Sequence, residues 1–151
     1  STTRGLFAGG YQGSTDSNVI DYITIASTGN ASDFGDLTEA RQTIGTSSNT
    51  RGLFIGGYSN PLSSYRNTID YVTIGSTGNA TDFGDTSTVT GREMATSNNT
   101  VAVFNVDNNG SNTNVLEKVT IASTGNSTDF GDLTVTSRYG YATSASHGGL
   151  S

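Results

Sequence analysis

The stretch IDYVTIGSTGNATDFGD, residues 69–85, decides the fold because two further segments of the chain closely resemble it. Residues 20–36 read IDYITIASTGNASDFGD, and residues 116–132 read LEKVTIASTGNSTDFGD. The Phe residues of the three copies, Phe34, Phe83 and Phe130, are 49 and 47 residues apart. A fixed period of this length indicates a repeat architecture in which each copy is one structural unit.

The similarity extends outward from this stretch on both sides. Upstream, residues 4–11 read RGLFAGGY and residues 51–58 read RGLFIGGY, whereas residues 101–104 read only VAVF. Downstream, an arginine follows each copy, and these residues are Arg41, Arg92 and Arg138. We therefore divide one domain, residues 1–151, into repeats of about 4–50, 51–100 and 101–150. Because buried charges need partners, we expect each arginine to pair with Asp or carbonyl groups of a neighbouring repeat.

Each repeat reads as four short strands, which in the first repeat are residues 4–8, 20–25, 33–38 and 41–46. No window has the apolar spacing of a helix, so we expect an all-β fold with less than about 5% helix, far below the average. The first strand is apolar on both faces. That pattern is typical of sheets covered on both sides, as stacked propeller blades are, whereas a one-sided sandwich strand alternates.

The order of apolar strand, Gly-Gly, Tyr, Ile-Asp-Tyr strand, aromatic strand and Arg resembles the kelch repeat, with Phe where kelch repeats carry Trp. The sequence of residues 20–36 resembles, more specifically, the kelch-like repeats of virion structural proteins from tailed phages of marine cyanobacteria. The resemblance implies kelch-like β-propeller blades with an Arg-led inner strand a, followed by strands b, c and d. In that order the chain is permuted: it starts at strand b and ends at strand a, and residues 146–150 begin another b strand.

Three blades are too few for a closed ring, since propellers have about four to eight. We therefore expect the chain to be part of a larger propeller or half of a six-bladed homodimer. In the homodimer, the last a strand of each chain completes the first blade of its partner and covers an open edge.

The composition excludes several classes of function. Gly, Ser, Thr and Asn make up more than half of the chain, Cys is absent, and the net charge is −6. No apolar run is long enough to span a membrane, and an acidic chain without a basic run does not suit nucleic acid. We therefore expect neither nucleic acid as a partner nor membrane insertion.

We expect no catalysis, because the carboxylate pair Asp33 and Asp36 recurs in every repeat. An enzyme needs one site with differentiated pKa values rather than three equal copies. In the Ser-Thr-Gly-Asn segments, Gly29, Gly78 and Gly125 suit a positive φ and the following Asn suits a backbone cap. Calcium is the alternative ligand there and at residues 107–112, which lack a terminal Glu. We otherwise expect no cofactor.

The b–c loops differ between repeats, at residues 12–18, 59–67 and 105–114, as do the d–a loops, for example residues 86–91. Varied loops on a constant scaffold are typical of a binding surface. The candidate contact residues are Tyr58, Tyr65, Arg66, Gln12, Asp16, Asn18, Asp107, Asn108, Asn109 and Asn112. Their polar groups and flat rings suit a sugar.

These observations favour a non-enzymatic phage virion protein of tail or fibre type, located in the virion or outside the cell. Its loop face binds host-surface glycan or protein, and its other partners are copies of itself and other virion proteins. Two alternatives stay open. One is a structural spacer or self-assembling scaffold module, and the other is a secreted calcium-dependent bacterial adhesin.

Overall fold

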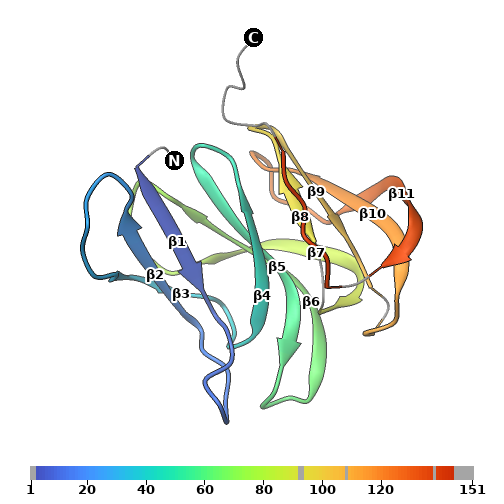
Figure 1. The fold of residues 1–151 in the computed structure, drawn as a ribbon, viewed down its shortest axis with the longest axis horizontal. Coiled ribbons are helices and arrows are strands. Elements are labelled where there is room, and N and C mark those ends of the chain that lie inside the picture. The colour runs from blue at the N-terminus through green and yellow to red at the C-terminus, as the bar shows by residue number, and fades with distance from the viewer. Residues whose placement is uncertain (1–2, 92–93, 108, 138, 145–151) are drawn as a thin grey trace.

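The computed structural model describes residues 3–91, 94–107, 109–137 and 139–144, which contain eleven strands and no helix (Figure 1). The expected all-β class is therefore confirmed for this part of the chain, which holds no helix that could cross a membrane. The strands are β1 Arg4–Ala8, β2 Val19–Thr24, β3 Ser32–Asp36, β4 Gln42–Ser47, β5 Arg51–Ser59, β6 Ser64–Thr73, β7 Thr81–Thr90, β8 Ala95–Ser97, β9 Val101–Asn105, β10 Thr113–Thr120 and β11 Thr128–Ser137.

The strands form three antiparallel sheets in which neighbours in sequence pair with each other. Sheet I is β1-β2-β3, sheet II is β4-β5-β6-β7 and sheet III is β8-β9-β10-β11, and Figure 1 shows them side by side in this order. Sheets II and III begin with β4 and β8, which contact each other. Among the described residues, no corresponding strand precedes β1. Residues 146–150, expected to begin a further strand, lie outside the described part.

Two apolar layers hold the sheets together. Between sheets I and II lie Ile20, Phe34, Leu37, Phe54 and Val72. The second layer, between sheets II and III, includes Leu53, Phe83, Phe104 and Val119. Leu53 and Phe54 are neighbours on β5 and are 0% and 6% exposed, so this strand is covered on both faces, as its apolar run predicts.

The loops expected at residues 59–67 and 86–91 are largely strand. β5 continues to Ser59 and β6 begins at Ser64, so only residues 60–63 form a turn, and β7 continues to Thr90. Tyr58 lies directly opposite Tyr65 in this extended hairpin. Cross-strand aromatic pairs stabilise such ladders, and this pairing overrides the polar composition that suggested a loop.

The Ser-Thr-Gly-Asn turns connect each sheet to the sheet before it. In the turn of sheet II, Gly78 N donates to Phe34 O at 2.7 Å, Ala80 N donates to Asp36 O at 2.7 Å, and Asn79 Oδ1 accepts from Asp36 N at 3.0 Å. The turn of sheet III makes the same three contacts to β7, through Gly125, Ser127 and Asn126, at 2.7, 2.9 and 3.0 Å.

These joints explain two features of the repeated motif. A Cβ atom on Gly35 would lie 2.4 Å from Gly78 O, and one on Gly84 would lie 2.5 Å from Gly125 O, so the close approach requires glycine in Asp-Phe-Gly-Asp. The expected positive φ is found at Gly78 and Gly125, with values of 157° and 151°. Gly29 does not adopt it, and its turn is the one without a neighbouring sheet.

Candidate functional site

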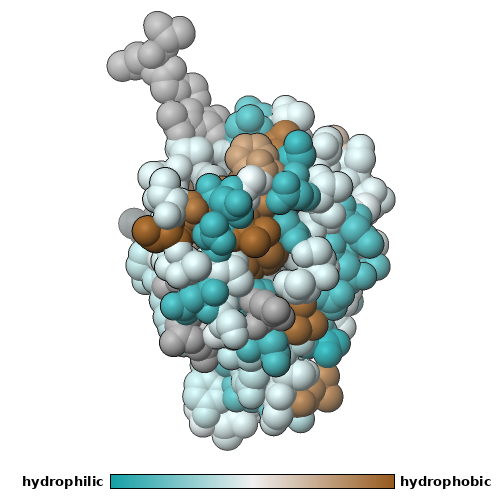
Figure 2. All heavy atoms as spheres, turned by 90° about the vertical axis from the view of Figure 1, so that its right-hand side faces the viewer, coloured by the Kyte–Doolittle hydropathy of each residue, from teal (hydrophilic) through white to brown (hydrophobic). Residues whose placement is uncertain are grey.

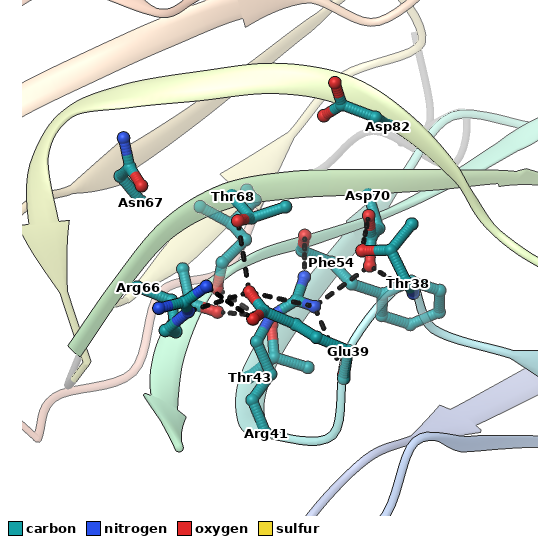
Figure 3. Close-up of polar contacts among 12 residues, drawn as sticks. Thr38, Glu39, Arg41, Thr43, Phe54, Arg66, Asn67, Thr68, Asp70 and Asp82 are labelled. Carbon is teal, nitrogen blue, oxygen red and sulfur yellow. Dashed lines mark hydrogen bonds and ion pairs between the residues drawn. The ribbon is translucent and has the colours of Figure 1, made fainter. Parts of the chain in front are cut away.

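A polar cluster around Arg41 and Asp70 joins sheets I and II and is structural (Figure 3). Arg41 is 0% exposed; its Nη1 donates to Asp70 Oδ2 at 3.0 Å and its Nε to Gly56 O at 2.8 Å. Asp70 also accepts from the backbone and hydroxyl of Thr38 at 3.1 and 2.7 Å. Every charge in the cluster is thus compensated, as burial requires.

The arginines that start β1 and β5 follow the same expectation. Arg4 Nη1 donates to Ile74 O at 2.9 Å, and Arg51 Nη1 donates to Ile121 O at 3.0 Å. Both therefore bind the carbonyl of the next sheet, and each guanidinium also covers a tyrosine ring, with centroid distances of 4.6 Å and 4.5 Å. Arg92 and Arg138 lie outside the described residues.

Arg66, one of the expected ligand contacts, is paired within the chain. Its Nη2 lies 2.7 Å from Glu39 Oε2, and its Nε donates to Glu39 Oε1 at 2.9 Å. Partial burial opposes ionisation of Glu39, but the hydrogen bond and charge of Arg66, with Arg41 and Thr68, outweigh it, so the pKa of Glu39 lies below its ordinary value. The hydrogen bond to Glu39 in turn raises the pKa of Arg66.

A polar hollow of about 640 Å³ lies where the β5–β6 hairpin, the start of β4, the end of β7 and the β9–β10 connection meet. The β5–β6 hairpin, the end of β7 and the β9–β10 connection are segments in which the repeats differ in sequence. The lining residues are Gln42, Tyr58, Ser63, Tyr65, Gly91, Asn109 and Tyr139.

Two tyrosines form one wall of the hollow. The rings of Tyr58 and Tyr65 meet edge to face, with centroids 5.0 Å apart. Glycines make room for the Tyr65 ring, because a Cβ atom on Gly91 would lie 2.2 Å from Tyr65 Cδ1 and one on Gly110 would lie 2.5 Å from Tyr65 Oη. The ring is therefore held in place by backbone that approaches it from the end of β7 and from the β9–β10 connection.

The backbone of the hollow is strained at three positions. Ser63, Asn109 and Tyr139 have φ values of 50°, 52° and 59°, and in the described residues they are the only non-glycine residues with positive φ. All three line the hollow. Such conformations cost free energy and cluster at ligand-binding sites. The strain therefore marks the hollow as the candidate site.

Of the residues expected from the sequence, Tyr58, Tyr65 and Asn109 line the hollow. Gln12, Asn18, Arg66 and Asn112 are not among the lining residues, and Asn108 lies outside the described part. Asp16 is 5% exposed and accepts from Gln42 Nε2 at 3.2 Å and from Asn60 Nδ2 at 2.8 Å, so it fixes the amide of a lining residue and the tip of the hairpin.

Asp107 is 0% exposed, and its Oδ1 accepts from Gly110 N at 3.2 Å. It therefore shapes the turn that brings Gly110 against Tyr65. Among the described residues, no three His, Asp or Glu side chains converge closely enough to hold a metal ion.

The sequence reasoning missed Gln42, Ser63, Gly91 and Tyr139. A signal for two of them was present, because Gln42 and Tyr139 each directly follow a repeated arginine, Arg41 or Arg138. Equivalent positions in the repeats thus converge on one hollow.

The described lining residues offer rings, hydroxyls and amides, and no charged side chain is among them. Tyrosine presents an apolar face beside a hydroxyl, while Asn and Gln both donate and accept hydrogen bonds. This set suits a neutral polyhydroxylated ligand. A search of protein-family models finds no match to the chain, and a search of curated proteins finds none either.

Proposed function

We propose that the chain is a non-catalytic binding module whose tyrosine-lined hollow takes a neutral glycan on a host-cell surface. The observation that carries this proposal is that all three left-handed, non-glycine residues of the described chain line the same hollow as the Tyr58–Tyr65 pair. Backbone strain at one concave, polar place, with aromatic rings beside amides, is best explained by selection for a ligand.

We further propose that the module is a kelch-like propeller segment of a phage virion protein of tail or fibre type. The support is the sequence resemblance of the repeats, together with meandering antiparallel sheets of the order expected for strands a to d. Contact between β4 and β8, the first strands of sheets II and III, is compatible with inner strands around a common axis.

Glycan binding is tested by applying the purified chain and its variants to a glycan array. Removing the ring in Tyr65→Ala should weaken binding by at least about 10-fold, because buried aromatic anchors dominate such interfaces. Arg66→Ala is the matched control: it changes the next residue of β6, which bonds Glu39 rather than lining the hollow, and it should bind normally. Circular dichroism melting confirms that both variants fold.

An array without any bound glycan, or equal binding by Tyr65→Ala and the parent chain, would contradict the proposal and favour the scaffold alternative. A loss of binding after addition of EDTA would favour the calcium-dependent adhesin.

A further inference from the structure

Each joint between successive sheets consists of a Ser-Thr-Gly-Asn turn bound to the Asp-Phe-Gly-Asp strand of the preceding sheet, and it occurs twice. A further copy of the turn, in sheet I, and a further copy of the strand, in sheet III, have no such partner among the described residues. The turn at residues 27–31 of sheet I is exposed, although Gly29 and Asn30 match Gly78 and Asn79 of the docked turn. We call this turn and the open edge of β1 the head.

At the opposite end, β11 carries the other half of the joint. Phe130 is 53% exposed, whereas Phe34 and Phe83 are each 2% exposed. Among the described residues, no atom outside the adjoining residues lies within 4 Å of a Cβ placed on Gly131, although Gly35 and Gly84 are closely covered by the next turn. Figure 2, which views the molecule from the side of sheet III, shows apolar groups exposed among polar ones. We call β11 and residues 139–144 the tail.

Each joint also contains a buried acid that accepts hydrogen bonds from the preceding repeat, and the equivalent acid of sheet I lacks these contacts. Asp70 accepts hydrogen bonds from Thr38 of the preceding repeat, and the equivalent Glu117 accepts one from Ser87 N at 3.2 Å. The equivalent residue of sheet I is Asp21. Within the described residues, no hydrogen bond or ion pair reaches its carboxylate, and it is only partly buried.

Residues 139–144 lie where the first strand of a further sheet is expected from the positions of β4 and β8. Ser97 Oγ donates to Ser47 O at 2.6 Å, and Ser144 Oγ donates to Ser97 O in the same way. Each of these serines follows a threonine at the end of its segment, in Thr46-Ser47, Thr96-Ser97 and Thr143-Ser144. The tail segment therefore lies beside β8 as β8 lies beside β4.

The head has room for such a strand beside the open edge of β1. A hollow of about 420 Å³ lies between β1 and β4, and its lining includes Gly5, Leu6, Thr46 and Ser47. On the same sheet, Phe7 is 59% exposed, whereas its equivalents Phe54 and Phe104 are 6% and 1% exposed. A strand in this hollow pairs with the open edge of β1 and removes exposed backbone groups from water.

We propose that two copies of the chain associate head to tail, so that residues 139–144 of each copy pair with β1 of the other. The turn at residues 27–31 then binds β11 of the second copy through the contacts seen twice within the chain. A twofold axis places the head of each copy on the tail of the other and leaves no open end. Two copies give six sheets, within the range of about four to eight that closed rings contain, while one or three copies fall outside it.

The known pairing of sheet II fixes the register of this contact. Ser47 lies opposite Gly52 and Thr46 opposite Leu53. By equivalence, Ser144 lies opposite Gly5, and Thr143 opposite Leu6, of the second copy. One contact is lost, because Val101 stands at the position of Arg4 and Arg51 and cannot donate to a carbonyl of the next sheet. The joint between copies is therefore weaker than the joints within a copy, and the dimer should be reversible.

Cysteine cross-linking tests this register directly, because the chain has no cysteine of its own. Gly5→Cys and Ser144→Cys are made as separate chains, mixed and oxidised. Opposed residues of an antiparallel pair are close enough for a disulfide. Ser47→Cys combined with Gly52→Cys in one chain is the matched internal control. It is equally crowded, since a Cβ on Gly5 meets Ile23 at 3.3 Å and one on Gly52 meets Leu6 at 3.3 Å.

We expect a covalent dimer in the mixture, and only weak cross-linking when either single variant is oxidised alone. The chain that carries both Gly5→Cys and Ser144→Cys should also cross-link as a dimer. Three results overturn the proposal: no dimer in the mixture while the control cross-links, equal dimer formation by one variant alone, or an intrachain disulfide in the double variant, which would mean that a single copy closes on itself.

Discussion

The pentapeptide Thr-Asp-Phe-Gly-Asp starts both β7 and β11, and its two copies have opposite environments. Phe83 of β7 is 2% exposed, and Phe130 of β11 is 53% exposed. Both strands are ten residues long, so the local sequence and the local structure are alike. The difference is that the turn of sheet III covers β7, while no sheet of the described residues covers β11. Burial in this molecule is therefore decided by the neighbouring sheet, and the same motif serves as core in one place and as exposed surface in another.

The largest contrast is expected between the two phenylalanines themselves. Phe83→Ala should lower the free energy of unfolding by about 3–5 kcal/mol, because it removes a buried ring and leaves a cavity. Phe130→Ala should cost less than about 1 kcal/mol in the monomer, where the ring is largely in water. Urea denaturation at low protein concentration measures both. Equal losses would show that the exposure of Phe130 does not describe the monomer.

The acids Asp70 and Asp21 give a second contrast. Asp70→Asn should cost about 3 kcal/mol, because it removes the hydrogen-bonded counter-charge of buried Arg41 and leaves only Glu39, at 4.0 Å, while retaining a hydrogen bond to Thr38. Asp21→Asn should change the stability of the monomer by less than about 0.5 kcal/mol. Urea denaturation again provides the measurement. A small effect of Asp70→Asn would mean that the ion pair does not hold sheets I and II together.

The turn asparagines separate stability from association. Asn79→Ala removes one hydrogen bond within the chain and should cost about 1 kcal/mol. Asn30→Ala should leave the unfolding of the monomer unchanged but weaken the dimer, because Asn30 contacts β11 of the second copy. Thermal melting and sedimentation of both variants check this pair of outcomes. If Asn30→Ala destabilises the monomer as much as Asn79→Ala does, the exposed turn is not the docking half of a joint.

The smallest effect concerns pH and the pair of Glu39 with Arg66. Since the folded pKa of Glu39 lies below its ordinary value of 4.5, ionised Glu39 contributes stability above that value, and the contribution is lost as the pH falls through the lower, folded pKa. In Glu39→Gln, the free energy of unfolding should therefore fall less as the pH is lowered through this range, and the difference from the parent chain should be less than about 1 kcal/mol. Arg66→Gln removes the other partner of the same pair and should weaken the pH dependence of the free energy of unfolding over the same range. An unchanged profile in both variants would rule out the pair as a source of acid sensitivity.

The repeat period and the apolar strands allowed the all-β class and most strand positions to be predicted. The first strand, Arg4–Ala8, was placed at its observed bounds, because Gly9 and Gly10 end an apolar run there. The hairpin around residues 60–63 could not be predicted, because Ser, Asn and Pro indicate a turn but do not say where cross-strand pairing begins.

The candidate site could be predicted only in part. The variation between repeats pointed to Tyr58, Tyr65 and Asn109, which the structure places in the lining of one hollow. Nothing in the sequence near Arg66 signals Glu39, which lies 27 residues away and pairs with it. The fit of Gly91 and Gly110 around one tyrosine ring likewise depends on contacts between distant segments, which local patterns do not encode.

Sedimentation equilibrium of the parent chain over a wide concentration range tests the central claim most directly, that the exposed motif copies are docking halves for a second copy. The account predicts a particle of twice the 15.6 kDa chain mass that dissociates on dilution, with the dissociation shifted to higher concentration by Asn30→Ala. A single species of 15.6 kDa at every concentration would contradict it.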